Sequence, residues 1–282
     1  MIAITGASGQ LGQLVIEDLL KTVAALQLVA IVRNPAKVSQ LAERGVQVRA
    51  ASYEDKAALV HALTGVEKLL LISSSEVGQR AIQHRNVIEA AKEAGVKLIA
   101  YTSLLHADTS PLGLAEEHVA TENMLQQSGI PFVLLRNGWY TENYLASVPP
   151  ALQHGAFIGS AGEGKIASAT RADYAAAAAK VMTQDNQAGK VYELAGDNGW
   201  TLAELAAELT KQSGKTVVYQ HLPEADFKAA LLGAGLPEGL AALLANSDVG
   251  ASKGGLFDDR RQLSELIGRP TTTLVDSLRT AV

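Results

Sequence analysis

The sequence predicts an α/β fold in which helices cover both faces of a doubly wound parallel sheet. Short apolar runs that suit buried strands alternate with segments of helical periodicity as far as residue 136. A glycine-rich turn follows the first run, and 282 residues are enough for one such sheet and a smaller appendage. We expect a first domain over 1–150, with part of 151–196 returning to it, and a smaller C-terminal α/β cap over 197–282.

The expected elements of the first domain follow from apolar runs and from glycines that suit helix ends. Strands are expected at 2–5, 28–32, 46–50, 68–73, 97–103 and 132–136. Helices are expected from Leu11 onward and over 56–63, 80–94 and 115–127, and a glycine follows each of the last three.

The pattern is less regular beyond residue 136. We expect a short helix over 139–145 that is closed by Pro149 and Pro150, and a glycine-rich loop over 156–165. We also expect an alanine-rich helix over 172–182 and strands at 191–196 and 216–220. The rest of the cap is expected to be helical.

The first turn has the spacing of a dinucleotide-binding site. Gly6, Gly9 and Gly12 follow the first strand and open the first helix. Gly6 permits a tight turn, Gly9 lets the backbone approach a diphosphate, and Gly12 lets the helix pack closely on the strand. We therefore expect a NAD(P)-binding Rossmann domain with the pyrophosphate at this helix N-terminus. The alternative is an ordinary glycine-rich turn.

The end of the second strand predicts which dinucleotide binds. A carboxylate about 20 residues past the last glycine holds the 2′-hydroxyl of NAD, whereas an arginine there accommodates the 2′-phosphate of NADP. No carboxylate lies between Leu28 and Leu41, and Arg33 directly follows the strand. Its guanidinium offers a charged fork to a phosphate, and Lys37 adds positive charge. We expect NADP(H); the alternative is that Arg33 is a solvated surface residue.

Composition excludes several classes of protein. The net charge of −5 argues against a nucleic-acid partner. The lack of cysteine excludes disulfides, thiolate nucleophiles and cysteine-bound metals; no histidine spacing suggests a metal either, and no flavin motif is present. No apolar run approaches the roughly 20 residues of a membrane span. Because the first strand starts at Met1, we expect no signal peptide and a cytoplasmic location. The oligomeric state stays open.

The chain lacks the catalytic pair of short-chain dehydrogenases, Tyr-x-x-x-Lys. None of its seven tyrosines has a lysine four residues later. Two histidines are candidate proton donors. The stronger is His118, on the helix expected after the fifth strand, and the weaker is His106. Three roles stay open for His118: proton donation, a bond to the nicotinamide ribose, or a place on a polar helix face. Ser103 ends the fifth strand, where such enzymes often have a helper serine.

Three stretches carry a resemblance to known proteins: Thr5–Gly12, Val32–Pro35 and Arg136–Tyr140. With longer stretches such as LLRNGWYTENYL and TRADYAAAA, they resemble atypical short-chain dehydrogenases of the NmrA-like family over essentially the whole chain. The resemblance implies flavin-independent hydride transfer from NADPH to a small-molecule quinone. The cofactor-binding residues implied are Gly6, Ala7, Ser8, Gly9, Gln10, Leu11 and Gly12 at the pyrophosphate, Arg33 at the 2′-phosphate, Ser73, Ser74 and Ser75 at the nicotinamide-side ribose, Asn137, Gly138, Trp139, Tyr140, Thr141 and Glu142 at the nicotinamide end, and Arg171 closing over the cofactor.

Residue positions at the strand ends support these assignments. Ser73, Ser103 and Asn137 all lie at the carboxyl ends of expected strands, where a doubly wound sheet opens its crevice. The chain departs from similar proteins at the adenine. They often have an aspartate after the third strand that bonds the adenine amine, whereas this chain has Ala51, Ser52 and Tyr53 there.

We expect the catalytic centre at His118, Asn137 and Tyr140. A quinone accepts hydride readily, so placing its ring against the nicotinamide supplies most of the catalysis and fits the missing pair. Two other functions stay open. One is an NADP(H)-binding redox sensor without turnover, which needs no open pocket beside the nicotinamide. The other is an ene reductase of the isoflavone-reductase type, whose relatives have a lysine where this chain has His118.

Overall fold

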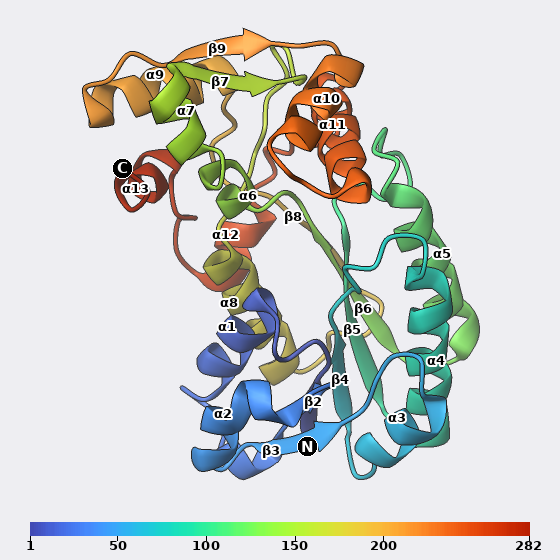
Figure 1. Ribbon diagram of the computed structural model, residues 1–282. Helices are drawn as coiled ribbons and strands as arrows, with labels where there is room; N and C mark the ends of the chain where they lie inside the picture. Colours follow the sequence, from blue (N-terminus) through green and yellow to red (C-terminus); the bar gives the residue numbers. More distant parts are fainter. The chain divides into compact units, whose positions relative to one another are not determined.

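The computed structural model describes residues 1–282, and its main element is a seven-stranded sheet in the order β3-β2-β1-β4-β5-β6-β8 (Figure 1). The strands are β1 Ile2–Ile4, β2 Leu28–Val32, β3 Gln47–Ala50, β4 Lys68–Leu71, β5 Leu98–Leu104, β6 Phe132–Asn137 and β8 Val191–Leu194. All neighbours from β3 to β5 pair in parallel. The strand order reverses between β1 and β4. The predicted doubly wound sheet with a switch point is therefore confirmed.

Two compact units make up the chain, and each is discontinuous in sequence. Unit 1 comprises Met1–Leu104, Glu116–Arg136 and Tyr174–Tyr192. Unit 2 comprises Leu105–Ala115, Asn137–Asp173 and Glu193–Val282.

Helices cover both faces of the sheet in unit 1. On one face lie α3 Lys56–Ala62, α4 Arg80–Glu93 and α5 Ala115–Ser128, and on the other lie α1 Gln10–Leu19 and α2 Ser39–Glu43 (Figure 1). The alanine-rich helix α8 spans Arg171–Thr183. Short 3-10 turns occur at Ala25–Gln27 and Pro35–Val38. No helix of the chain combines the length and the apolar character needed to cross a bilayer.

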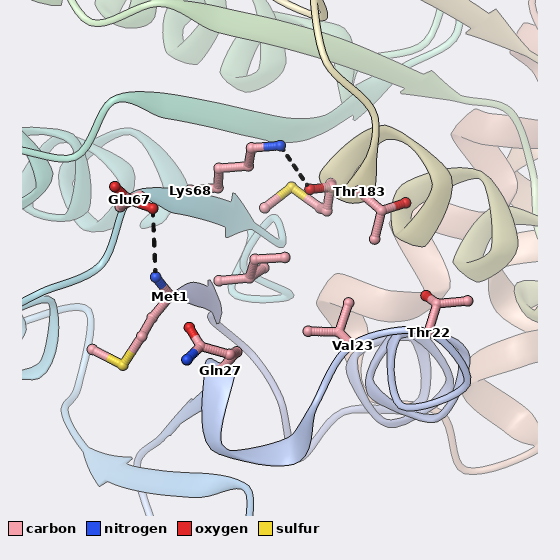
Figure 2. A pocket seen from close by; sticks show the side chains of 9 residues that line it. Met1, Thr22, Val23, Gln27, Glu67, Lys68 and Thr183 are labelled. Carbon is pink, nitrogen blue, oxygen red and sulfur yellow. Dashed lines mark hydrogen bonds and ion pairs between the residues drawn. The ribbon is translucent and has the colours of Figure 1, made fainter.

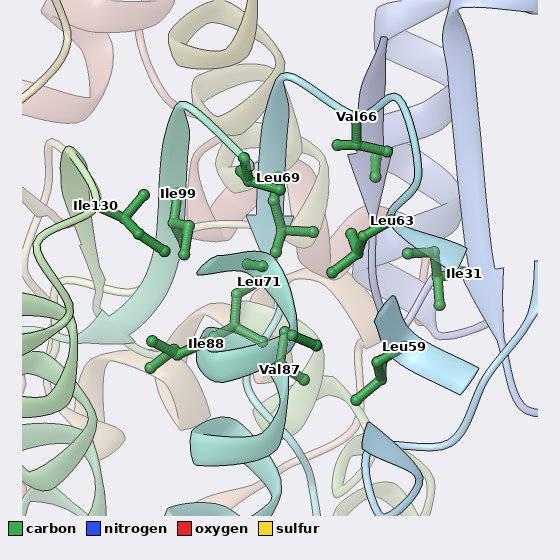
Figure 3. Close-up of a cluster of buried hydrophobic side chains, with 14 of the residues drawn as sticks. Ile31, Leu59, Leu63, Val66, Leu69, Leu71, Val87, Ile88, Ile99 and Ile130 are labelled. Carbon is green, nitrogen blue, oxygen red and sulfur yellow. The ribbon is translucent and has the colours of Figure 1, made fainter. Parts of the chain in front are cut away.

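One hydrophobic core of unit 1 lies between the sheet and helices α3 and α4 (Figure 3). Ile31, Leu69 and Leu71 from the strands pack there with Leu59 from α3 and Val87 from α4, and all five are almost completely buried. Burying a side chain of this size stabilises the fold by about 2 kcal/mol. The continuous apolar runs of β2 and β4 are explained by this burial, because a parallel sheet is covered on both faces.

Unit 2 contains a second sheet of two parallel strands, β7 Ala156–Gly159 and β9 Val218–His221. Its helices are α6 Thr141–Leu145, α7 Val148–His154, α9 Leu202–Ser213, α10 Glu224–Gly233, α11 Glu238–Ser252, α12 Gln262–Ile267 and α13 Leu274–Arg279. The predicted strand near 216–220 is confirmed by β9.

Two local predictions for unit 2 were wrong. The segment 156–165 was expected to be a loop, but its first four residues form β7, whose partner lies about 60 residues later in the chain. Such a distant partner leaves no trace in the local pattern. The helix expected over 139–145 is α6, which ends before Pro149 and Pro150. These prolines lie in the first turn of α7, a helix that was not expected, and the missing N–H of proline costs nothing there.

Candidate functional site

The glycine-rich turn between β1 and α1 depends on the absence of side chains. Gly6 has φ +61°, in the left-handed region that favours glycine. A Cβ on Gly12 would lie 2.4 Å from the carbonyl oxygen of Gly6, so only glycine lets α1 pack this closely. Gly9 caps α1 without any side-chain hydrogen bond. The first-turn amides of α1 therefore lack a capping side chain and suit an anion.

Arg33 lies directly after β2, as predicted, and its side chain is 73% exposed. Its Nη1 donates a hydrogen bond to Oε1 of Glu76 at 2.8 Å. The next residue, Asn34, accepts a hydrogen bond from the Ala36 amide at 3.0 Å and so begins the following 3-10 turn. The residue expected at the 2′-phosphate therefore has a carboxylate partner in this structure.

The serines that follow β4 are held by neighbouring side chains. The Ser73 amide donates to Oγ1 of Thr102 at 2.8 Å, and the Ser74 amide donates to Nε2 of His84 at 2.9 Å. Arg80 donates through Nε to the carbonyl oxygen of Ser74. These roles of His84 and Arg80 were not predicted from the sequence. Their signal is a run of buried polar residues at the start of α4, which is visible only once burial is known.

Ser103 at the end of β5 is engaged in an ionic network of unit 1. Its hydroxyl donates to Oε1 of Glu122, and Arg136 binds the same carboxylate through Nε at 3.0 Å and Nη2 at 2.7 Å. The side chains of Glu122 and Arg136 are largely buried. Glu122 was not predicted from the sequence, because a glutamate on a helix is ordinarily solvated.

His118 is buried within unit 1 and does not lie on a solvated helix face. Its side chain is only 3% exposed, and Nδ1 lies 2.7 Å from the hydroxyl oxygen of Tyr101. Burial, together with the positive charge of Arg80 and the nearby His84, lowers the pKa of His118 to about 3. The ring is therefore neutral near pH 7, which argues against proton donation by an imidazolium at this position.

His106, the weaker candidate, lies between two carboxylates of unit 2. Its Nε2 lies 3.2 Å from Oδ2 of Asp258, and its Nδ1 lies 3.6 Å from Oε2 of Glu193. Its backbone amide donates to the same Glu193 oxygen at 2.8 Å, and its φ of +52° is in the left-handed region. These contacts anchor the residue, which the sequence offered as the weaker candidate proton donor.

Asn137 contributes an unpaired acceptor to unit 2. The residue is 5% exposed, and its Oδ1 has no hydrogen-bond partner. A buried acceptor without a partner costs about 1–3 kcal/mol. Such a group is therefore a candidate contact for a donor on a ligand.

The structure brings Tyr140, Glu142 and Arg171 together. The guanidinium carbon of Arg171 lies 4.4 Å from the centre of the Tyr140 ring. The Arg171 amide donates to Oε1 of Glu142 at 2.9 Å, and its Nη1 lies 3.4 Å from Oε2. The backbone of Trp139 and Thr141 pairs with Ala169, which holds this segment beside the chain that leads to Arg171.

A cavity of about 470 Å³ lies at the amino edge of the sheet in unit 1 (Figure 2). It is lined by Met1, Ile2, Thr22, Val23, Gln27, Glu67, Lys68, Met182 and Thr183. Lys68 extends across its rim and donates to the Met182 carbonyl oxygen at 3.1 Å. Doubly wound sheets bind their ligands at the carboxyl edge, so this cavity is not the predicted dinucleotide site.

A doubly wound sheet with this turn at its switch point defines a dinucleotide-binding protein of the Rossmann class. Residues 1–276 match the NmrA-like family. The chain therefore belongs to the NmrA-like family, and the resemblance seen in the sequence is confirmed.

Relatives with established names are similar over almost the full length of the chain. Quinone oxidoreductase 2 of Escherichia coli (strain K12) is 73% identical over 278 residues, covering 99% of this chain and 97% of that protein. The crystal structure of the E. coli NADPH-dependent quinone oxidoreductase QOR2 complexed with NADPH matches with a TM-score of 0.98, covering 99% of both chains. Citrobacter sp. triphenylmethane reductase complexed with NADP(H) matches with a TM-score of 0.96 at 41% identity, covering 100% of both.

Proposed function

We propose that this protein is an NADPH-dependent oxidoreductase that reduces quinones by direct hydride transfer without flavin. The observation that carries the proposal is the 73% identity, over nearly the whole of both chains, to a quinone oxidoreductase whose structure holds NADPH. The glycine-rich turn and Arg33 support the same cofactor independently of that similarity.

The residues present fit NADP(H) at four places. The uncapped amides after Gly9 bind the pyrophosphate, and the exposed guanidinium of Arg33 binds the 2′-phosphate. Asn137 accepts a hydrogen bond from an N–H of the ligand, which satisfies its unpaired Oδ1. The hydroxyls of Ser74 and Ser75 bind the nicotinamide-side ribose.

Bound NADPH supplies the hydride, and the protein supplies position. Asn137 and Tyr140 hold the nicotinamide and the acceptor ring in register, and Arg171 maintains the position of Tyr140 through its ring contact. His118 acts as a neutral group that supports β5 through Tyr101. A quinone needs little acid assistance, so a bound hydride donor and correct positioning of the two rings are sufficient for its reduction. The cytoplasmic location and the absence of a nucleic-acid partner stay predictions of the sequence.

The test is oxidation of NADPH by the purified, flavin-free protein with a simple benzoquinone, corrected for the uncatalysed reaction and repeated with NADH. Arg33→Ala should weaken NADPH binding much more than NADH binding. Arg44→Ala is the matched control, because it removes another exposed arginine that pairs with a glutamate, Glu17. Saturable turnover with a preference for NADPH supports the proposal. Tight NADPH binding without turnover on several quinones would favour the redox sensor.

A further inference from the structure

The ion pair between Arg33 and Glu76 joins two loops of unit 1 at the carboxyl edge of the sheet. Arg33 follows β2, and Glu76 lies in the loop after β4. In the sheet, β1 lies between β2 and β4. The contact therefore connects the segments on either side of the strand that leads into the glycine-rich turn. Of the two side chains, Glu76 is the more buried, with 39% exposure against 73% for Arg33.

Glu76 is held in place by contacts other than the one with Arg33. Its second carboxylate oxygen, Oε2, accepts a hydrogen bond from Nε2 of the buried Gln83 at 2.9 Å. Its backbone amide donates to Oγ of Ser74 at 3.2 Å. The carboxylate is thus directed by α4 and by its own loop, and Arg33 is the more exposed partner.

A buried histidine fixes the loop that carries Glu76. The Ser74 amide donates to Nε2 of His84, so Nδ1 of that ring carries the hydrogen and donates to Oγ1 of Thr121 at 2.9 Å. Thr121 in turn donates to the carbonyl oxygen of Glu117 at 2.9 Å. Only a neutral ring supports this chain of bonds. Burial and the charge of Arg80 lower the pKa of His84 to about 3, which keeps the ring neutral.

We propose that Glu76 is a cofactor-selectivity residue whose carboxylate competes with the 2′-phosphate of NADPH for the guanidinium of Arg33. The inference rests on the proposed function. A 2′-phosphate that binds Arg33 either displaces Glu76 or lies next to it, and two anions that share one cation repel each other. NADH has no 2′-phosphate, so Glu76 does not compete with it for Arg33. Glu76 therefore weakens the binding of NADPH and of NADP⁺, which favours release of the oxidised product.

The direct test is the substitution Glu76→Gln, which removes the charge and keeps the shape of the side chain. Dissociation constants for NADPH and NADH are measured by calorimetric titration, without turnover. Exposed ion pairs are weak, so we expect the dissociation constant for NADPH to fall about three-fold and that for NADH to stay the same. Glu93→Gln is the matched control, because it removes an exposed carboxylate of α4 that pairs with Lys56. It should change neither constant.

A double-mutant cycle shows whether Glu76 acts through Arg33. In the Arg33→Ala background, Glu76→Gln should have no effect on NADPH binding. An equal gain in that background, an equal gain for NADH, or a weaker binding of NADPH would each overturn the inference. Because binding is measured without turnover, a protein that binds NADPH but does not reduce quinones contradicts only the proposed function. A wild-type protein without any preference for NADPH contradicts the proposed function, whereas the double-mutant cycle alone decides whether Glu76 competes for Arg33.

Discussion

Acid should destabilise this protein through the buried imidazole of His118. Burial lowers the pKa of the ring to about 3, from an ordinary value of 6.5. Between these values the unfolded chain binds a proton that the native chain excludes, so stability is lost as the pH falls below about 6.5. Each pH unit well inside this window costs about 1.4 kcal/mol, which amounts to about 2 kcal/mol between pH 7 and pH 5.

The assay is urea unfolding of the wild type and of His118→Gln at pH 7, 6 and 5. Glutamine still offers a hydrogen bond toward Tyr101, but it does not titrate. Other buried groups contribute in the same window: His84, with a pKa also lowered to about 3, adds to the loss. Asp248 opposes it, because burial raises its pKa to about 6 and its native carboxyl keeps a proton that the unfolded chain has released. Both contributions are common to the two proteins, so the difference between their pH slopes isolates His118.

We expect the variant to lose about 2 kcal/mol less than the wild type between pH 7 and pH 5. The variant starts from a lower stability at pH 7, because its contact with Tyr101 is altered, but the pH slope is independent of that offset. Equal slopes would refute the reasoning. They would mean that native His118 titrates near its ordinary pKa, and its imidazolium would again be a candidate proton donor.

Three further predictions concern the turn, the unpaired acceptor and the buried ion pair. Gly12→Val should abolish NADPH binding and lower the melting temperature, because its Cβ would meet the Gly6 carbonyl oxygen; calorimetry that finds normal binding would contradict this. Asn137→Leu should leave the free energy of unfolding unchanged or raise it by about 1 kcal/mol, and yet weaken NADPH binding; lost stability with normal binding would show a purely structural role. Glu122→Gln should cost about 3 kcal/mol in urea unfolding, because the guanidinium of Arg136 loses its bidentate partner, and a change below about 1 kcal/mol would argue against that pair.

The agreement between sequence and structure is best where local chemistry is decisive. Gly6 has a positive φ, and Gly12 has no space for a side chain, as their spacing after a strand indicated. The buried runs of β2 and β4 were recognisable because strands of a covered parallel sheet are apolar on both faces. Arg33 lies directly after β2, as expected, because its position depends only on where that strand ends.

Prediction from the local sequence failed where a strand or side chain pairs with a partner that is distant in the chain. The strand β7 depends on β9, and Ser103 depends on Glu122 and Arg136. None of these pairings has a period or a spacing that could reveal it, because each forms only when separate segments pack together.

The sequence by itself determined the class of fold, the conformation of the glycine-rich turn and the expectation of a phosphate-bearing cofactor, because each depends on residues that are neighbours along the chain. Only the tertiary structure decided the protonation state of His118 and the partner of Arg33. Burial sets the first, and a loop after another strand supplies the second. Electrostatic properties of this kind depend on what surrounds a group in space, and the same residue in the same motif behaves differently when its surroundings change.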